Sequence, residues 1–206
     1  TAETLSSSIS IHDRILTEQI PSSQDFLATI LEAMKSNIVL RMTFHSFTMT
    51  KAKTFLVEPY CVKMSAQRWY MLARNVDYNY LRLYSLDRME DVWLTDAHFA
   101  LPKDFCAKEY FAEYYGIVLD ESAPLQRIVL RADKYHQHYM RTLPLHPSQR
   151  EIFTCDDYAD FELTLRPTYD FYMKLMSFGN MIKVLEPESL QEKIYKWLEK
   201  TIEIYK

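Results

Sequence analysis

The stretch from residue 38 to residue 95 limits the fold most strongly, because it is a series of short runs rich in β-branched and aromatic residues. About five such runs follow one another, separated by polar turns. Strands this short and this closely spaced predict a small, highly curved sheet or barrel. A helix is predicted before them from apolar residues at helical spacing, namely Phe26, Leu27, Ile30, Leu31 and Met34. Residues 1–23 are interpreted as a linker, with Ser22 or Ser23 capping that helix.

The second half of the chain changes pattern. Pro102–Tyr115 is predicted to be helical, with Gly116 as its stop. Acidic and small residues at 119–124 indicate a domain boundary. From residue 125 the pattern reads strand, helix, strand, strand, helix, strand and a last helix, which is the ferredoxin-like order with one helix added. The predicted fold class is therefore α+β, with a small β-barrel followed by a ferredoxin-like α/β sandwich.

Composition excludes several classes of protein. The 206 residues carry 24 Lys and Arg against 28 Asp and Glu, a net charge of −4, whereas a general nucleic-acid-coating protein is strongly basic. No apolar run approaches the ~20 residues that cross a membrane, and residues 1–10 do not form a signal peptide. The cysteines, at positions 61, 106 and 155, are isolated and lack CxxC spacing. We therefore expect a cytoplasmic protein without a disulfide framework, metal site or membrane contact.

The sequence offers little support for an enzyme. Its two glycines, Gly116 and Gly179, cannot build a Gly-rich phosphate loop or a nucleophile elbow. His136 and His138 are two residues apart in a predicted helix, so they do not share a face and are poor metal ligands. We predict no catalytic residues and no cofactor.

Positive charge and aromatic residues gather between residues 63 and 88. This segment contains five Lys and Arg residues and two Asp residues. Its net charge is therefore 5 − 2 = +3, inside a chain whose net charge is −4. Strand alternation turns Arg68 and Tyr70 away from the apolar face of one run. The same argument turns Arg82 and Tyr84 outward in the next run. If the two runs pair as a hairpin, these four side chains share one surface.

Arginine beside tyrosine on a sheet suits an anionic ligand such as a nucleotide or oligonucleotide. Guanidinium groups bind phosphate bidentately, and aromatic rings stack on bases at ~1–3 kcal/mol each. The alternative is an ordinary solvated strand face on which arginines lie over tyrosines for packing. His45, at the end of the first predicted strand, could hydrogen-bond a ligand or be a plain surface histidine.

Two motifs resemble those of WYL-domain proteins, which are mostly bacterial transcriptional regulators named for a Trp-Tyr-Leu motif. The first is Arg68–Met71, in which Met71 replaces the leucine. The second is Arg82–Arg88, which matches an R-x-(F/Y)-x-L-D-R signature. Phe44 stands where many members carry Tyr. Three further segments resemble the C-terminal extension called WCX, namely 143–149, 165–168 and 184–187. The resemblance as a whole runs from about residue 12 to the end.

The resemblance implies an Sm-like WYL domain at residues 24–118 and a ferredoxin-like WCX extension at 125–206. It also implies an effector-sensing role: the WYL surface binds a ligand, single-stranded nucleic acid or a nucleotide in some members. Binding then alters the DNA binding of an N-terminal winged helix-turn-helix domain. No such domain fits before residue 24, and the chain starts with Thr1, so we expect a fragment that reaches DNA through a missing N-terminal domain.

The expected chain is thus the sensing and dimerisation part of a regulator, a homodimer without enzymatic activity. The hypothesised ligand contacts are Arg68, Tyr70, Arg82 and Arg88, with Tyr84, Ser85 and His45 at the rim. Trp69 is expected in the core or wall. The rival hypothesis is a structural dimerisation module without a ligand, in which Arg82 and Arg88 pair with carboxylates of the partner subunit.

Overall fold

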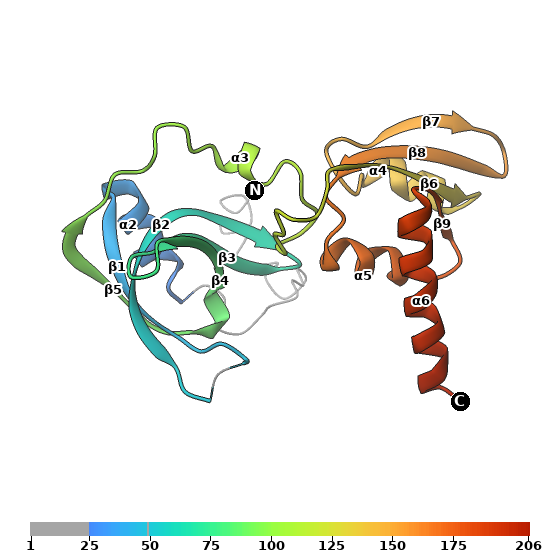
Figure 1. Cartoon of the computed structure of the whole chain (residues 1–206). Coiled ribbons are helices and arrows are strands. Elements are labelled where there is room, and N and C mark those ends of the chain that lie inside the picture. The colour runs from blue at the N-terminus through green and yellow to red at the C-terminus, as the bar shows by residue number, and fades with distance from the viewer. Residues whose placement is uncertain (1–24, 49) are drawn as a thin grey trace, which may run out of the picture. The chain divides into compact units, whose positions relative to one another are not determined.

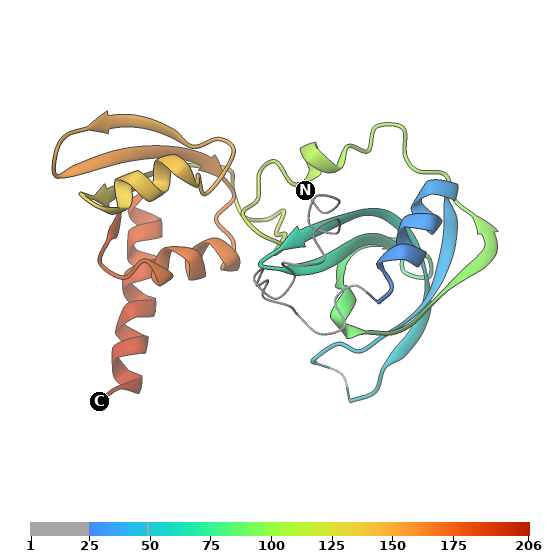
Figure 2. The same ribbon diagram turned by 180° about the vertical axis from the view of Figure 1, so that it is seen from behind.

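The structure is a computed structural model that describes residues 25–48 and 50–206. The chain divides into two compact units, the first ending at Pro102 and the second starting at Lys103. Figures 1 and 2 show the ribbon from opposite sides. The predicted linker at 1–23 and the predicted caps, Ser22 and Ser23, lie outside the described residues.

In the part of the first unit that the structure describes, one helix is followed by five strands, as the sequence predicts. Its sheet has the order β4-β3-β2-β1-β5, and every neighbouring pair is antiparallel. The elements are α2 (Leu27–Ser36), β1 (Ile38–Phe44), β2 (Lys53–Ser65), β3 (Arg68–Asn75), β4 (Tyr80–Ser85), the 3-10 turn η2 (Leu86–Arg88) and β5 (Met89–His98). Helix α2 ends at Asn37, whose left-handed φ of 52° lets its N–H reach the Ala33 carbonyl.

The first sheet curls around its core (Figure 1). The β2–β3 pairing shifts register between Pro59 and Cys61, and the β1–β5 pairing shifts twice. Such bulges bend strands and increase their twist, and proline favours one because it has no N–H to donate. Strands β4 and β5 are the two edges of the sheet. The inner face and α2 enclose the buried core, which is Ile30, Ala33, Leu40, Met42, Phe44, Val57, Met71, Ala73, Tyr84, Leu86, Met89 and Val92.

The second unit has the predicted order strand, helix, strand, strand, helix, strand, helix. Its antiparallel sheet has the order β7-β8-β6-β9. The elements are α3 (Ala107–Tyr110), β6 (Gln126–Asp133), α4 (His136–Thr142), β7 (Arg150–Thr154), β8 (Tyr158–Leu165), α5 (Tyr169–Ser177), β9 (Ile182–Glu186) and α6 (Glu188–Ile204).

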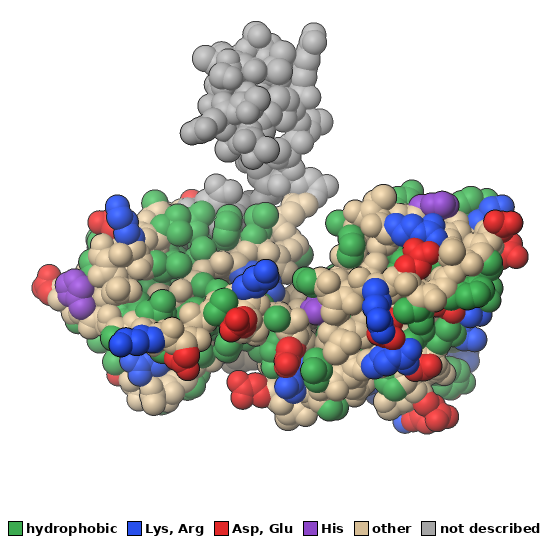
Figure 3. All heavy atoms as spheres, turned by 90° about the horizontal axis from the view of Figure 1, so that it is seen from above, with side chains coloured by type: hydrophobic (Ala, Val, Ile, Leu, Met, Phe, Trp, Pro, Cys, Tyr) green, Lys and Arg blue, Asp and Glu red, His purple; other side chains and the backbone are tan. Residues whose placement is uncertain are grey.

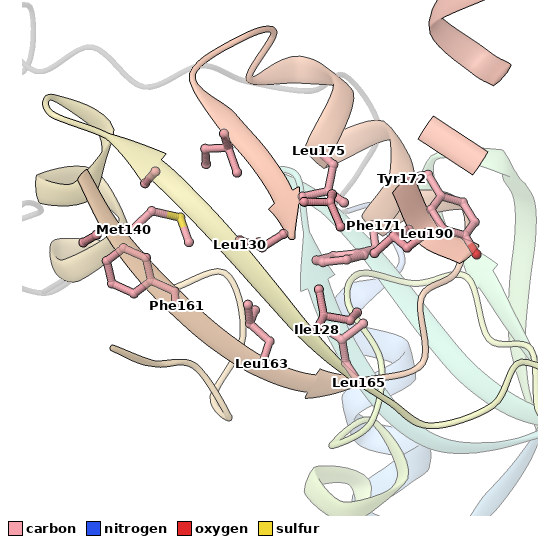
Figure 4. Close-up of a cluster of buried hydrophobic side chains, with 14 residues drawn as sticks. Ile128, Leu130, Met140, Phe161, Leu163, Leu165, Phe171, Tyr172, Leu175 and Leu190 are labelled. Atoms are coloured by element: carbon pink, nitrogen blue, oxygen red, sulfur yellow. The ribbon is translucent and has the colours of Figure 1, made fainter. Parts of the chain in front are cut away.

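The two faces of this second sheet differ in polarity. Helices α4, α5 and α6 lie on one side, and apolar side chains such as Leu130, Phe161 and Phe171 fill the space there (Figure 4). Acidic and basic side chains lie side by side on one surface of the unit (Figure 3). Glu162 on β8 pairs with Arg127 on β6 and Arg150 on β7. The alternation of strand residues between core and charge explains why these runs were recognisable as strands.

The helix predicted at Pro102–Tyr115 is wrong, because only the four residues of α3 are helical. Tertiary hydrogen bonds hold the rest in another conformation, and they override local propensity. The Arg166 N–H donates to the Glu113 carbonyl at 2.7 Å. The N–H groups of Ile117 and Val118 donate to the Asp170 carboxylate at 2.7 and 2.9 Å.

Residues 113–118 are therefore held by the second unit, although sequence interpretation assigned them to the first domain. Gly116 is also not a helix stop. It has a φ of +80°, and a Cβ built on it would lie 2.3 Å from Asp170 Oδ2. Glycine is needed here because the backbone approaches the Asp170 carboxylate closely.

Candidate functional site

The register of the β3–β4 hairpin decides where the predicted site residues lie. Tyr70 pairs with Ser85, Met71 with Tyr84, and Ala73 with Arg82. Directly paired residues of antiparallel strands project from the same face. Tyr84 and Arg82 therefore lie on the apolar face of β3. The expectation that they share one surface with Arg68 and Tyr70 is wrong.

The connection between the strands explains this outcome. Asn79 adopts a left-handed φ of 51°, and the Tyr78 N–H donates to the Asn75 side chain at 3.0 Å. This turn geometry fixes which residues pair. Because side chains alternate along a strand, a change of pairing by one residue moves every side chain to the opposite face.

Tyr84 is a core residue rather than a rim residue, since it is only 2% exposed. Its ring contacts Phe44 edge-on, with the centroids 5.2 Å apart, and Phe55 at 5.7 Å. Burial raises the pKa of the Tyr84 hydroxyl, and the nearby Asn75 side chain partly offsets that rise. The site is thus built around a buried aromatic group that strand alternation alone did not predict.

Arg82 and Arg88 lie over this aromatic group. The Arg82 guanidinium is 5.9 Å from the centroid of the Tyr84 ring. The Arg88 guanidinium lies 4.7 Å from the centroid of Phe44 and 4.4 Å from that of Phe47. We call these five residues the arginine–aromatic cluster. Phe47, which the sequence interpretation missed because it lies in a loop after β1, is 82% exposed.

The arginines of the hairpin divide into paired and unpaired groups. Arg68 lies 3.3 Å from Asp87, and Arg74 makes two 2.6 Å hydrogen bonds to Glu58. Arg82 and Arg88 form no ion pair with any residue that the structure describes. These two guanidinium groups are therefore the ones free to meet an anion.

Burial and several nearby side chains shift the pKa of Arg88. Burial lowers its pKa, Asp87 opposes that shift, and the positive charges of Arg82 and Arg68 add to it. Tyr70 also acts on Arg88, so the structure brings the predicted residues within electrostatic range even though the hairpin separates their faces. His45 is tied to Arg88 through its backbone N–H, which donates to the Arg88 carbonyl at 3.0 Å. The His45 ring is exposed and lies 3.9 Å from Glu90.

The segment from Ser85 to Arg88 holds an unusual concentration of unsatisfied polar atoms. Native proteins satisfy nearly all of their buried polar groups, so each exception requires an explanation. Within the described parts of the chain, three buried side-chain atoms of this segment have no hydrogen bond, namely Ser85 Oγ, Asp87 Oδ1 and Arg88 Nε. They are one hydroxyl group, one carboxylate acceptor and one charged donor. The charged donor, Arg88 Nε, belongs to one of the two unpaired arginines and suits an anionic ligand.

No group of three or more His, Cys, Asp or Glu side chains in residues 25–48 and 50–206 could hold a metal ion. No helix in that same part of the chain has the length and apolar character needed to span a membrane.

Comparison with protein families identifies the two units. The WYL domain matches residues 25–94, and the WCX domain matches residues 124–202. The chain thus contains a WYL domain followed by a WCX domain. The motif Arg68–Met71 forms the start of β3 in this WYL domain. Met71 is fully buried in the position of the family leucine, and Trp69 packs against the core, as expected.

Two solved structures are similar to this WYL protein over most of its length. Proteasome accessory factor B/C (PafBC) of Arthrobacter aurescens is 20% identical with a TM-score of 0.43, and the match covers 87% of this chain and 27% of that one. A CRISPR Cas-related protein is 12% identical with a TM-score of 0.43, over 86% of this chain and 50% of that one. The chain thus spans half or less of their lengths. A comparison with curated protein sequences gives no significant match.

Proposed function

We propose that this chain is the effector-sensing and dimerisation part of a WYL transcriptional regulator. Its effector is anionic, either single-stranded nucleic acid or a nucleotide, and binds at the arginine–aromatic cluster. One observation carries the proposal: Arg82 and Arg88 form no ion pair with a described residue, and Arg88 Nε is buried without a hydrogen bond to the described residues. A bound phosphate would accept a hydrogen bond from Arg88 Nε.

The chemistry of the cluster favours a nucleotide over a simple anion. Phe47 offers an exposed ring on which a base can stack, at about 1–3 kcal/mol per base. The Arg88 guanidinium already lies over that ring, so one residue would orient both the phosphate and the base. Burial lowers the Arg88 pKa and thus disfavours its charged form, and a phosphate placed next to it would offset that cost.

The regulatory part of the proposal rests on the family. The proposal is that effector binding alters DNA binding by a domain outside this chain. It also holds that two copies of the chain form a cytoplasmic, non-enzymatic homodimer. The fold supports the family architecture, an Sm-like WYL barrel and a ferredoxin-like WCX sandwich, through its five-stranded curled sheet and the β7-β8-β6-β9 order. Coupling requires the effector to favour one arrangement of the regulator over another.

A titration of labelled single-stranded DNA and RNA, at low and high salt, tests the effector site. Arg82→Ala and Arg88→Lys are compared with the wild type after thermal melting has confirmed that each variant is folded. Arg88→Lys keeps the charge but loses the planar, bidentate guanidinium. Arg41→Ala is the matched control, because Arg41 is exposed on β1 and its loss changes the net charge equally.

We expect binding that weakens with salt, drops on the order of tenfold in both cluster variants, and is unchanged in Arg41→Ala. Nucleotides are titrated in the same series. Equal losses in Arg41→Ala and Arg82→Ala would show non-specific attraction and contradict the site. If no strand or nucleotide binds, and Arg82→Ala instead weakens dimerisation in sedimentation experiments, the purely structural role is correct.

A further inference from the structure

A cleft of about 390 Å³ lies within the second unit, between the WCX domain and the loop that precedes it, far in sequence from the arginine–aromatic cluster. All of its lining residues belong to the second unit. The volume falls in the range of about 300–1,000 Å³ that is typical of small-molecule sites. Aromatic rings, two buried uncharged polar groups and one charge of each sign line it, and each of these features restricts what the cleft can bind.

Thr168 is the first such feature. It stands at the N-cap of α5 and is only 4% exposed. A threonine at this position ordinarily accepts a hydrogen bond from the first turn of its helix. Here the side chain makes no capping bond, and Oγ1 has no hydrogen bond with any described residue. A buried hydroxyl without a bond is unfavourable for the fold, which suggests that its bond is made to something the cleft binds.

Gln126 is the second feature and lies on another element, at the start of β6. Its side-chain Oε1 is buried and likewise has no hydrogen bond from the part of the chain that the structure describes. The Gln126 amide carries a carbonyl oxygen and an NH2 group. It can therefore offer a ligand either a hydrogen-bond acceptor or two donor hydrogens. Two side-chain oxygens of residues that line one cleft, Gln126 Oε1 and Thr168 Oγ1, thus have no hydrogen bond from the described residues.

The aromatic residues of the lining are Tyr169, Tyr172 and Trp197. The Trp197 ring centroid is 5.8 Å from that of Tyr169 and 5.6 Å from that of Tyr172. Tyr172 is anchored in the buried cluster of the domain beside Leu190 (Figure 4). Tyr169 is 56% exposed, so part of its ring is accessible. These residues offer ring surfaces at fixed positions, which suits a planar ligand.

The charged residues of the lining are Lys193 and Asp120, both exposed. The Lys193 ammonium lies 4.1 Å from the centroid of the Tyr172 ring. The Ser122 hydroxyl and N–H hold the pKa of Asp120 below its ordinary value, and Lys193 contributes to this shift. Carboxylate oxygens accept hydrogen bonds from sugar hydroxyls, whereas an ammonium group attracts phosphate.

We propose that this cleft binds a nucleobase. A base is planar and uncharged, and its edge carries adjacent donors and acceptors that match the Gln126 amide and the Thr168 hydroxyl. Glutamine forms bidentate pairs with such an edge, as it does with adenine in nucleic-acid complexes. A simple anion would leave the amide oxygen unsatisfied, and an apolar ligand would leave both groups unsatisfied. Asp120 and Lys193 would then meet the sugar and any phosphate.

Calorimetric titration of the whole chain with adenosine, guanosine, cytidine and uridine tests the proposal. The main variant is Thr168→Val, which keeps the shape of the side chain and removes the hydroxyl. Gln126→Leu is a second variant on another element. Thr164→Val, an exposed threonine on β8 of the same domain, is the matched control. Thermal melting with and without nucleoside is measured for each protein.

We expect at least one nucleoside to bind the wild type, with affinity reduced on the order of tenfold in Thr168→Val and in Gln126→Leu. The melting temperature of free Thr168→Val should be equal to or higher than that of the wild type, because the substitution removes an unsatisfied hydroxyl. Thr164→Val should bind as the wild type does. A purely structural role for Thr168 would not produce this opposition between stability and binding.

A nucleobase can come from a free nucleoside or from a single strand, and dinucleotides distinguish the two sources. Tighter binding of dinucleotides, still weakened by Thr168→Val, indicates a strand. Binding equal to that of nucleosides indicates a free metabolite. The proposal is overturned if neither probe binds, which would leave water in the cleft, or if folded Thr168→Val and Gln126→Leu bind as tightly as the wild type. Its failure is distinguishable from failure of the effector site, which Arg82→Ala tests in the other domain.

Discussion

Glu58 is a carboxylate that is buried in the first sheet, with only 6% of the residue exposed. Arg74 binds it through two hydrogen bonds of 2.6 Å and also donates to Asn79 at 2.7 Å. A bidentate pair of this kind fixes the β2–β3 pairing near the start of the β4 hairpin. The two residues therefore help to position the strand that carries Arg82, although neither belongs to the arginine–aromatic cluster.

Arg74→Leu should lower the free energy of unfolding by about 1–3 kcal/mol, because it leaves the buried Glu58 without a counter-ion. The figure is below that of a fully buried pair, since the Arg74 side chain is 38% exposed and water screens part of the interaction. Urea unfolding measures the loss. The double variant Glu58→Leu/Arg74→Leu should regain stability relative to Arg74→Leu, and a double variant less stable than the single one would contradict this account.

The three cysteines should differ in reactivity. Burial raises the pKa of the Cys61 thiol to about 11, whereas Cys106 and Cys155 are exposed. A raised pKa keeps the thiol protonated up to a higher pH, so at pH 8 roughly one Cys61 in a thousand is the reactive thiolate. Mass spectrometry after timed iodoacetamide treatment should find Cys106 and Cys155 modified first. Modification of Cys61 at the same rate in the folded protein would show that it is accessible.

At the scale of elements, the conformation of the loop before β6 requires a glycine at position 116. Both glycines of the chain have positive φ, +80° for Gly116 and +59° for Gly179, but only Gly116 faces a close neighbour. Gly116→Ala should lower the free energy of unfolding by about 2 kcal/mol or more, because the new methyl group displaces Asp170 from the loop. Gly179→Ala is the control and should cost only about 1 kcal/mol, the conformational cost of a positive φ. Chemical unfolding of both variants measures the loss in the free energy of unfolding. Equal losses in Gly116→Ala and Gly179→Ala would show that the contact with Asp170 does not contribute.

The elements that could be predicted from sequence are those whose pattern is local. The strands of both sheets and the helices α2, α5 and α6 were recognisable from alternation or helical spacing. The segment at 102–115 was not, because its conformation depends on bonds to Arg166 and Asp170 far along the chain. Leu31, predicted on the apolar stripe of α2, is 46% exposed for a related reason, since the sheet covers a narrower face than the stripe offers.

The candidate site, too, depends on contacts that a local sequence pattern does not reveal. Arg82 and Arg88 could be singled out by charge and by family signature, but the face of Tyr84 depends on the β3–β4 register, which a turn at Asn79 sets. Alternation within one strand does not contain that information. Phe47 and the unsatisfied atoms of residues 85–88 emerge only after packing, because burial and hydrogen bonding are properties of the folded chain.

At the scale of the whole molecule, each unit has its own buried core and its own candidate site. The WYL domain presents unpaired guanidinium groups and an exposed ring, whereas the WCX domain presents neutral polar groups among aromatic walls. The two sites differ in chemistry and therefore in the part of a nucleotide that each would recognise. If both bind, linkage requires that any effect of one ligand on the affinity of the other be reciprocal.

Separate cores also predict that the second unit folds alone, and the position of its boundary can be tested. A chain of residues 103–206 should give a cooperative thermal transition and native circular dichroism. A chain of residues 119–206, cut where composition suggested a boundary, loses the bonds from Ile117 and Val118 to Asp170 and the Arg166–Glu113 ion pair.

The shorter chain should melt at a lower temperature, because Asp170 and the backbone N–H of Arg166 lose their partners. Asp170→Ala in the longer chain should reproduce part of that loss. Equal melting temperatures for the two chains would show that residues 103–118 add nothing to the second unit. A lower melting temperature in the shorter chain would assign the loop at 113–118 to the WCX domain and explain why its conformation cannot be predicted from its own sequence.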